Sequence, residues 1–161
     1  GILVPHVTSA EEAAGIVKAA RFGEGGRGYA GSTRAAVYTR KSMADHLADS
    51  DRQTTVIVQI EDLAALPNVR DIATVDGIDA IFIGRIDLAV AMGKSPSDDA
   101  VVETVHTICA EASAAGTTVG MFTADLGEIP MWREAGSSLF LLGSDHSFML
   151  AGANELASTV G

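Results

Sequence analysis

The sequence is short of the residues that build disulfide frameworks or thiolate metal sites, because Cys109 is its only cysteine. A single thiol excludes an internal disulfide and any site that needs several cysteine ligands. Cys109 lies in an apolar helical stretch with Val102, Ile108 and Ala112, so we expect it to be a small core residue.

Positive charge is also scarce, because the sequence has 11 Lys and Arg against 21 Asp and Glu. Its net charge is −10. Nucleic acids are bound through Lys and Arg, so this balance argues against a nucleic-acid partner. No apolar run approaches the roughly 18–20 residues that span a bilayer, and no signal peptide is recognisable. We therefore expect a cytoplasmic protein without a membrane partner.

What the sequence does contain is a regular alternation of short apolar runs with helical stretches, which predicts a parallel sheet covered by helices in one domain, residues 1–161. The expected strands are Ile2–Val4, Thr54–Ile60, Ala80–Ile83, Thr118–Phe122 and Leu139–Leu142. The expected helices cover residues 8–20, 33–48, 63–75, 98–115, 126–135 and 147–158. Thr8 and Glu11 are expected to form a capping box for the first helix.

Five βα units admit two α/β architectures, an open doubly wound sheet or part of a (β/α)₈ TIM barrel. A complete barrel typically needs about 250 residues, so this chain would supply about five units, strands 4–8. The apolar start, Gly1–Pro5, reads as a buried strand without a lead-in. We therefore expect further residues upstream of Gly1.

Candidate functional residues follow the strands, because parallel α/β folds gather their sites at the carboxyl ends of strands. Gln59 and Glu61 are two positions apart and point to the same side, and Asp87 follows the next strand. Two such carboxylates repel unless a cation neutralises them, and oxygen ligands suit Mg²⁺ or Mn²⁺. From spacing alone, helix caps or surface charges are the favoured interpretation of these acids.

The stretch from Val58 to Leu88 reads VQIEDLAALPNVRDIATVDGIDAIFIGRIDL and closely resembles the core signature of the HpcH/HpaI aldolase family. That signature combines an IE strand, an N-x-x-x-I helix and G-x-D-x-x-F-I-G-x-x-D-L. Residues 4–13, Gly26–Gly28 and Gly143–Asp145 resemble further family segments, so the resemblance spans essentially the whole chain. It implies a TIM barrel in which Glu61 and Asp87 are metal ligands.

Three departures from the family pattern surround Asp87. The family usually has Pro where Arg85 stands, Ser or Ala where Ile86 stands, and Ser where Ala89 stands. A bulkier Ile86 is expected to narrow the acceptor pocket, and Arg85 to add positive charge near the substrate carboxylate. These departures bear on substrate choice rather than on metal binding.

The resemblance implies a class II aldolase that cleaves 2-keto-4-hydroxy acids reversibly to pyruvate and an aldehyde through an enolate. A divalent ion, Mg²⁺ or Mn²⁺ with Co²⁺ also possible, would act as the Lewis acid. Gln59 would hydrogen-bond the substrate or a water, and the N–H groups of Ile86 and Asp87 would bind the pyruvate carboxylate. The family's catalytic arginine and histidine match no position here and are expected upstream of Gly1, and family members are commonly trimers or hexamers that exchange their last helix.

Five further residues at or near the expected strand ends and loops have candidate roles. Arg27 is expected to order its loop and His146 to begin a helix, whereas His6 is either a pocket wall or a buried structural histidine. Phe122 and Thr123 are candidates for the aldehyde pocket by position alone.

Three rival functions stay open. A coenzyme A thioester lyase or a citrate-synthase-like relative would use the same barrel, although the acidic charge weighs mildly against coenzyme A. A non-catalytic fragment or assembly subunit would bind no metal. A flavodoxin-like sheet with an acidic phosphoacceptor pocket needs acids at the first strand's end, where Pro5 and His6 stand.

Overall fold

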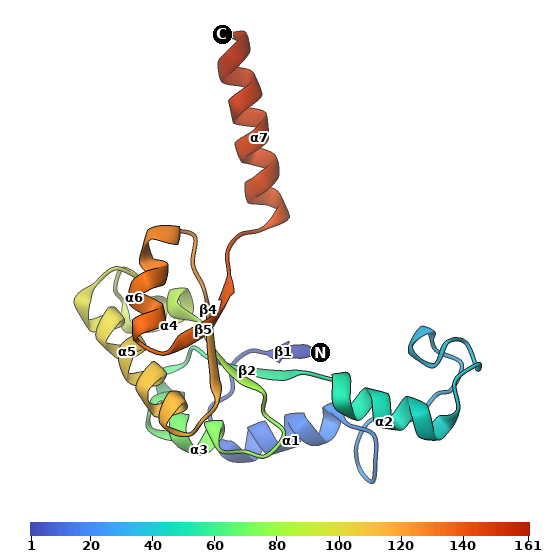
Figure 1. Ribbon diagram of the computed structural model, residues 1–161. Coiled ribbons are helices and arrows are strands. Elements are labelled where there is room, and N and C mark those ends of the chain that lie inside the picture. The colour runs from blue at the N-terminus through green and yellow to red at the C-terminus, as the bar shows by residue number, and fades with distance from the viewer.

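The computed structural model describes all residues of the chain and contains one five-stranded sheet with helices between the strands (Figure 1). The strands are β1 (Ile2–Val4), β2 (Val56–Ile60), β3 (Ala80–Ile83), β4 (Thr118–Phe122) and β5 (Ser137–Leu141). The α-helices are α1 (Ala10–Ala20), α2 (Met43–Gln53), α3 (Val69–Ala73), α4 (Arg85–Met92), α5 (Asp99–Ala114), α6 (Ile129–Glu134) and α7 (Asp145–Val160). Short 3₁₀ segments cover η1 (Arg34–Ala36), η2 (Leu63–Asn68) and η3 (Leu126–Glu128).

All neighbouring strands are parallel and lie in the order β1-β2-β3-β4-β5. This sequential order contains no point at which the strand order reverses. A doubly wound sheet requires such a reversal, and its ligand site lies there. The predicted α/β class is therefore confirmed, and the open doubly wound alternative does not describe these five strands.

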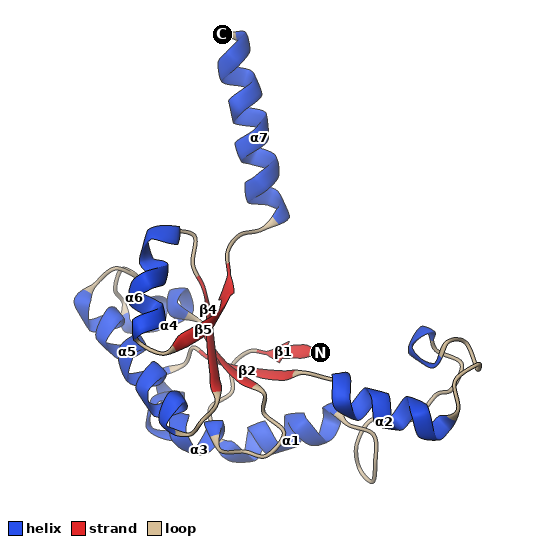
Figure 2. Ribbon diagram, viewed as in Figure 1, coloured by secondary structure: helices blue, strands red, loops and turns tan.

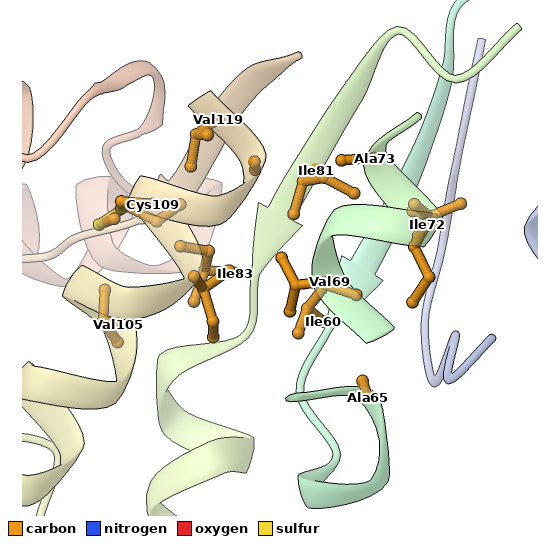
Figure 3. Close-up of a cluster of buried hydrophobic side chains, with 14 of the residues drawn as sticks. Ile60, Ala65, Val69, Ile72, Ala73, Ile81, Ile83, Val105, Cys109 and Val119 are labelled. Atoms are coloured by element: carbon orange, nitrogen blue, oxygen red, sulfur yellow. The ribbon is translucent and has the colours of Figure 1, made fainter. Parts of the chain in front are cut away.

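The two faces of the sheet differ in what covers them. On one face, strand side chains in register pack under helices α1, α3 and α5 (Figure 2). These core strand residues are Val58, Ile60, Ile81, Ile83, Val119 and Met121. Figure 3 shows four of them, Ile60, Ile81, Ile83 and Val119, beside helix residues such as Ile72 and Val105. The opposite face carries Gln59, Phe82 and Leu139 in register, and no helix packs on it.

Helix α7 stands away from the sheet (Figure 1) and has no buried residue. Its exposed apolar side chains are Phe148, Met149, Leu150, Leu156 and Val160. A Ser144 capping box begins the helix. No helix of the chain combines the length and the apolar character that a membrane span requires.

Several helix predictions need correction. Residues 33–42 form only η1 and turns, and α2 begins after the Ser42 cap and ends at Gln53. The second strand begins at Val56 rather than at the predicted Thr54. The first helix is capped by Ser9, and Thr8 instead donates to Glu12, so the predicted pairing with Glu11 is wrong. Helix α4 was not predicted as an element, because its apolar run follows Gly84, which provides no capping side chain.

Candidate metal and substrate site at the strand ends

Glu61 follows β2 directly and is buried, with 3% of its side chain exposed. Its Oε1 accepts a hydrogen bond from the backbone N–H of His6, at 2.9 Å. Its Oε2 accepts one from the side-chain amide of Gln59. A buried carboxylate is costly unless it is hydrogen-bonded, and here both oxygens are bound. The two donors therefore fix the position of Glu61 at the sheet edge.

His6 lies at the same edge because β1 pairs with β2 and ends just before it. Its φ of 58° is in the left-handed region, and its Nδ1 lies 3.2 Å from Glu61 Oε1 and 3.0 Å from Asp62 Oδ2. The hydrogen bond with Asp62, followed by the negative charges of Glu61 and Asp62, raises the pKa of His6 above 6.5, with a smaller contribution from Asp87. The side chain is 69% exposed, so the buried-histidine interpretation is wrong.

Gly84 joins β3 to α4 and packs directly against Glu61. Its N–H donates to the carbonyl of Ile60 at 3.0 Å. A Cβ at this position would lie 2.7 Å from Glu61 Cβ and 2.8 Å from both Glu61 Oε2 and Gln59 Nε2. The start of α4 can approach Glu61 this closely because residue 84 has no side chain.

Asp87 is the third residue of α4, so the same turn that contacts Glu61 also carries the second predicted metal ligand. Its side chain is exposed, and its charge contributes to the raised pKa of His6. The first N–H groups of a helix have no intrahelical partner, and Gly84 supplies no side-chain cap. Ile86, which is 51% exposed, and Asp87 thus belong to a turn whose N–H groups suit an anion.

The donor chemistry at this edge fits a hard divalent cation, which prefers carboxylate oxygens and retains waters. No group of three or more His, Cys, Asp or Glu side chains gathers in a metal-binding arrangement. The chain therefore offers no complete ligand set of its own, and a cation shared by Glu61 and Asp87 stays a prediction.

Arg85 does not point toward this edge, which corrects the expectation of a positive charge near the substrate carboxylate. Its Nη1 lies 2.8 Å from Glu128 Oε2, and its guanidinium lies over the fully buried Trp132 ring. Thr123 is also buried on the helix side, where its hydroxyl donates to the carbonyl of Asp125. Phe122 remains 38% exposed.

Arg27 and His146 occupy the places that their sequence contexts suggested. Arg27 donates to Ser50 Oγ at 2.6 Å and lies 3.9 Å from the centre of the Phe22 ring, so it orders the glycine-rich loop. His146 is in the first turn of α7, where its Nδ1 contacts the neighbouring Asp145.

A separate cavity of about 400 Å³ lies between the segment that follows α1 and helix α2, where Phe22, Leu47 and Asp51 are among its lining residues. Neither Glu61 nor Asp87 lines it. We place the candidate site at the strand ends because the buried acid, its donors and the free helix N–H groups converge there.

A sequentially ordered parallel sheet with a buried acid at its carboxyl edge defines an α/β protein with a candidate site at its strand ends. The chain belongs to the HpcH/HpaI aldolase/citrate lyase family, whose family model matches residues 1–151. It is 34% identical to a hydroxypyruvate/pyruvate aldolase of Pseudomonas aeruginosa, over 97% of this chain and 59% of the relative. It is 37% identical to a 5-keto-4-deoxy-D-glucarate aldolase of Salmonella arizonae, over 98% and 62%.

Solved structures give the same picture. A HpcH/HpaI aldolase/citrate lyase family protein from Burkholderia cenocepacia J2315 superposes with a TM-score of 0.88 at 30% identity, over 98% of this chain and 63% of that one. Citrate synthase SbnG superposes with a TM-score of 0.81 at 27% identity, over 99% and 62%. The chain thus spans about three-fifths of the length of these relatives.

Proposed function

We propose that the full-length protein is a divalent-metal-dependent aldolase that cleaves 2-keto-4-hydroxy acids reversibly to pyruvate and an aldehyde. The observation that carries the proposal is Glu61, a buried carboxylate held on both oxygens against the turn that bears Asp87. Family membership supports this chemistry, and two similar relatives are named as aldolases.

We further propose that the five strands are strands 4–8 of a TIM barrel. Sequential parallel order and helices on one face only are what an arc of such a barrel requires, since its other face lines the interior. In that arrangement Gln59 and Phe82 face the interior, and Glu61 lies at its mouth, where barrel enzymes carry their active sites.

Glu61 and Asp87 would hold Mg²⁺ or Mn²⁺, with Co²⁺ as a third candidate. The cation supplies a Lewis acid for the pyruvate enolate. The side-chain amide of Gln59 keeps Glu61 oriented by donating a hydrogen bond to it. The same amide would form a further hydrogen bond with the substrate or a water. The N–H groups of Ile86 and Asp87 would receive the pyruvate carboxylate, because the positive end of a helix favours an anion.

In the cleavage direction the 4-hydroxyl loses its proton, the C3–C4 bond breaks and its electrons form the enolate of pyruvate, which takes a proton at C3. The aldehyde leaves as the second product. The proton-transfer group and the arginine that stabilises the enolate are proposed to lie in the part of the barrel that precedes Gly1. The substrates are therefore a small 2-keto acid and an aldehyde. The name of the 5-keto-4-deoxy-D-glucarate aldolase relative suggests an aldehyde derived from a sugar acid.

The decisive experiment supplies the full-length protein and Mn²⁺ with pyruvate plus short aldehydes, and in parallel with acetyl-CoA plus glyoxylate. We expect carbon–carbon bond formation with pyruvate, and its loss after Glu61→Gln. Turnover only with the thioester would instead favour the second candidate, a coenzyme A thioester lyase or citrate-synthase-like enzyme. The observation that supports this second candidate is the structural similarity to citrate synthase SbnG.

We also propose that the protein is a homo-oligomer, a trimer or hexamer, in which α7 packs on another copy. A 16-residue helix with no buried residue and several large apolar side chains lacks a partner within its own chain. Contiguous exposed apolar side chains of this kind commonly mark interaction surfaces.

A further inference from the structure

A second polar cluster lies behind the first turn of α4, on the side covered by α6. Arg85 and Glu128 form its ion pair, with Nη1 and Oε2 2.8 Å apart. The same Oε2 accepts from Trp132 Nε1 at 3.2 Å and from Thr123 Oγ1 at 3.4 Å. One carboxylate oxygen thus connects the start of α4, the end of β4 and the start of α6.

The cluster is largely withdrawn from solvent. The Arg85 side chain is 13% exposed, that of Glu128 is 27% exposed, and Arg85 Nε is buried without a hydrogen-bond partner. A guanidinium in such a place is stabilised by its partner and by the Trp132 ring, whose centre lies 5.5 Å from Arg85 Cζ. Removing either charge leaves the other buried and unpaired, which is strongly unfavourable.

The position of Arg85 in α4 gives this pair a consequence for the strand-end site. Arg85 is the first residue of the helix and Asp87 the third, so their side chains leave the helix about 200° apart at 3.6 residues per turn. Arg85 therefore holds this turn in place from the side of the helix opposite to the one that carries Asp87. Gly84 has no side chain that could cap this turn. The ion pair is thus the side-chain contact that connects the turn to the segment between β4 and α6.

We propose that Arg85 and Glu128 are a positioning pair that holds the first turn of α4 against Glu61. The pair keeps the Asp87 carboxylate and the free N–H groups of the turn in place for a divalent cation and an anionic substrate. The metal part of this inference rests on the proposed function. The ordering of the turn does not, because it follows from contacts within the chain.

The test uses the full-length protein with Arg85→Gln and Glu128→Gln, which remove one charge each and keep a similar shape. Lys94→Gln is the matched control, because Lys94 pairs with Asp98 just beyond the opposite end of the same helix. Two quantities are measured. One is the affinity for Mn²⁺, by titration of free Mn²⁺ in electron paramagnetic resonance. The other is amide hydrogen exchange of Leu88 in metal-free protein, because the Leu88 N–H closes the first turn of α4 by donating to the carbonyl of Gly84 at 2.9 Å.

We expect both glutamine variants to bind Mn²⁺ roughly 10-fold or more weakly, as for other residues that orient metal ligands. We also expect faster exchange at Leu88, with both quantities unchanged in Lys94→Gln. Exchange at wild-type rates in both folded variants overturns the inference, whatever the metal does. If a glutamine variant does not fold, Arg85→Met, which keeps the packing over Trp132, is measured in its place and interpreted identically. Absence of Mn²⁺ binding in the wild type instead contradicts the proposed function, while the exchange rates still decide the inference.

Discussion

At the scale of single residues, the candidate site depends on how a buried carboxylate is accommodated. Glu61 receives one hydrogen bond from the backbone of His6 and one from Gln59, so its burial is compensated by donors from two adjacent strand ends. The donors also restrict its rotamer. A ligand held in this way loses little conformational freedom when it binds a cation, which favours affinity.

Gly84 offers a sharp test of this packing. We expect Gly84→Ala to displace Glu61, because the new Cβ would lie 2.7 Å from Glu61 Cβ. Crowding of this kind typically costs about 1–3 kcal/mol of stability. Thermal unfolding and Mn²⁺ affinity of the variant are the measurements, with Gly93→Ala as a control for a glycine whose added Cβ meets no atom within 4 Å. Gly93 has a φ of 66°, whereas the φ of Gly84 is −83°. Gly93→Ala should therefore lower stability through backbone strain but leave the Mn²⁺ affinity at the wild-type value.

Cys109 allows a second prediction at this scale. Burial raises the pKa of its thiol to about 11, so the thiol stays protonated at pH 8. We expect the native wild type and Cys109→Ala to react with Ellman's reagent to the same extent. In guanidinium the wild type should show one thiol more. An additional reactive thiol in the native wild type would contradict the buried position.

At the scale of elements, the strands were easier to predict from sequence than the helix that matters most. Alternating apolar runs identified all five strands, with ends that differ by a few residues. Helix α4 was not predicted, because no capping residue precedes the apolar residues around Asp87. Its first turn is held instead by contacts between residues distant in sequence, such as that of Arg85 with Glu128. Glu61 and Asp87 could be chosen from spacing and family resemblance. The contact of His6 with Glu61 could not, because it depends on the left-handed backbone at His6 and on strand pairing.

The start of α1 provides a pH-dependent test at the same scale. The N–H and hydroxyl of Thr8 donate to Glu12 Oε2 at 2.7 and 2.9 Å, which lowers the pKa of Glu12 below its ordinary 4.5. A lowered pKa contributes stability that is fully present above 4.5 and is lost as the pH falls through the folded-state value. Glu12→Gln should therefore be less stable than the wild type at pH 7, and the difference should shrink below pH 4.5. A difference between the two proteins that stays constant from pH 7 to below pH 4.5 would contradict this role of Glu12.

At the scale of the whole molecule, the chain presents two surfaces that its own residues leave uncovered, the open sheet face and helix α7 (Figure 1). Leu3 and Leu139 on that sheet face are exposed, as are the apolar residues of α7. Sequence patterns marked these segments as strand and helix, but they do not specify which partner covers them.

The role of α7 is tested by the mass of the assembly. We expect Phe148→Asp together with Leu156→Asp to yield a smaller species in light scattering after size-exclusion chromatography, because charges are placed in an apolar interface. Glu155→Gln on the same helix is the control and should keep the wild-type mass. An unchanged mass for the double variant would show that α7 does not hold copies together.

The central claim is that Glu61 and Asp87 bind one divalent cation. Its most direct test is the anomalous difference density of crystals of the full-length protein grown with Mn²⁺. The account predicts one strong peak with a carboxylate oxygen from each of the two residues at about 2.1–2.2 Å, distances ordinary for hard cations with oxygen ligands. A peak that contacts only one of them, or the absence of any peak at this edge in Mn²⁺-saturated crystals, would contradict it.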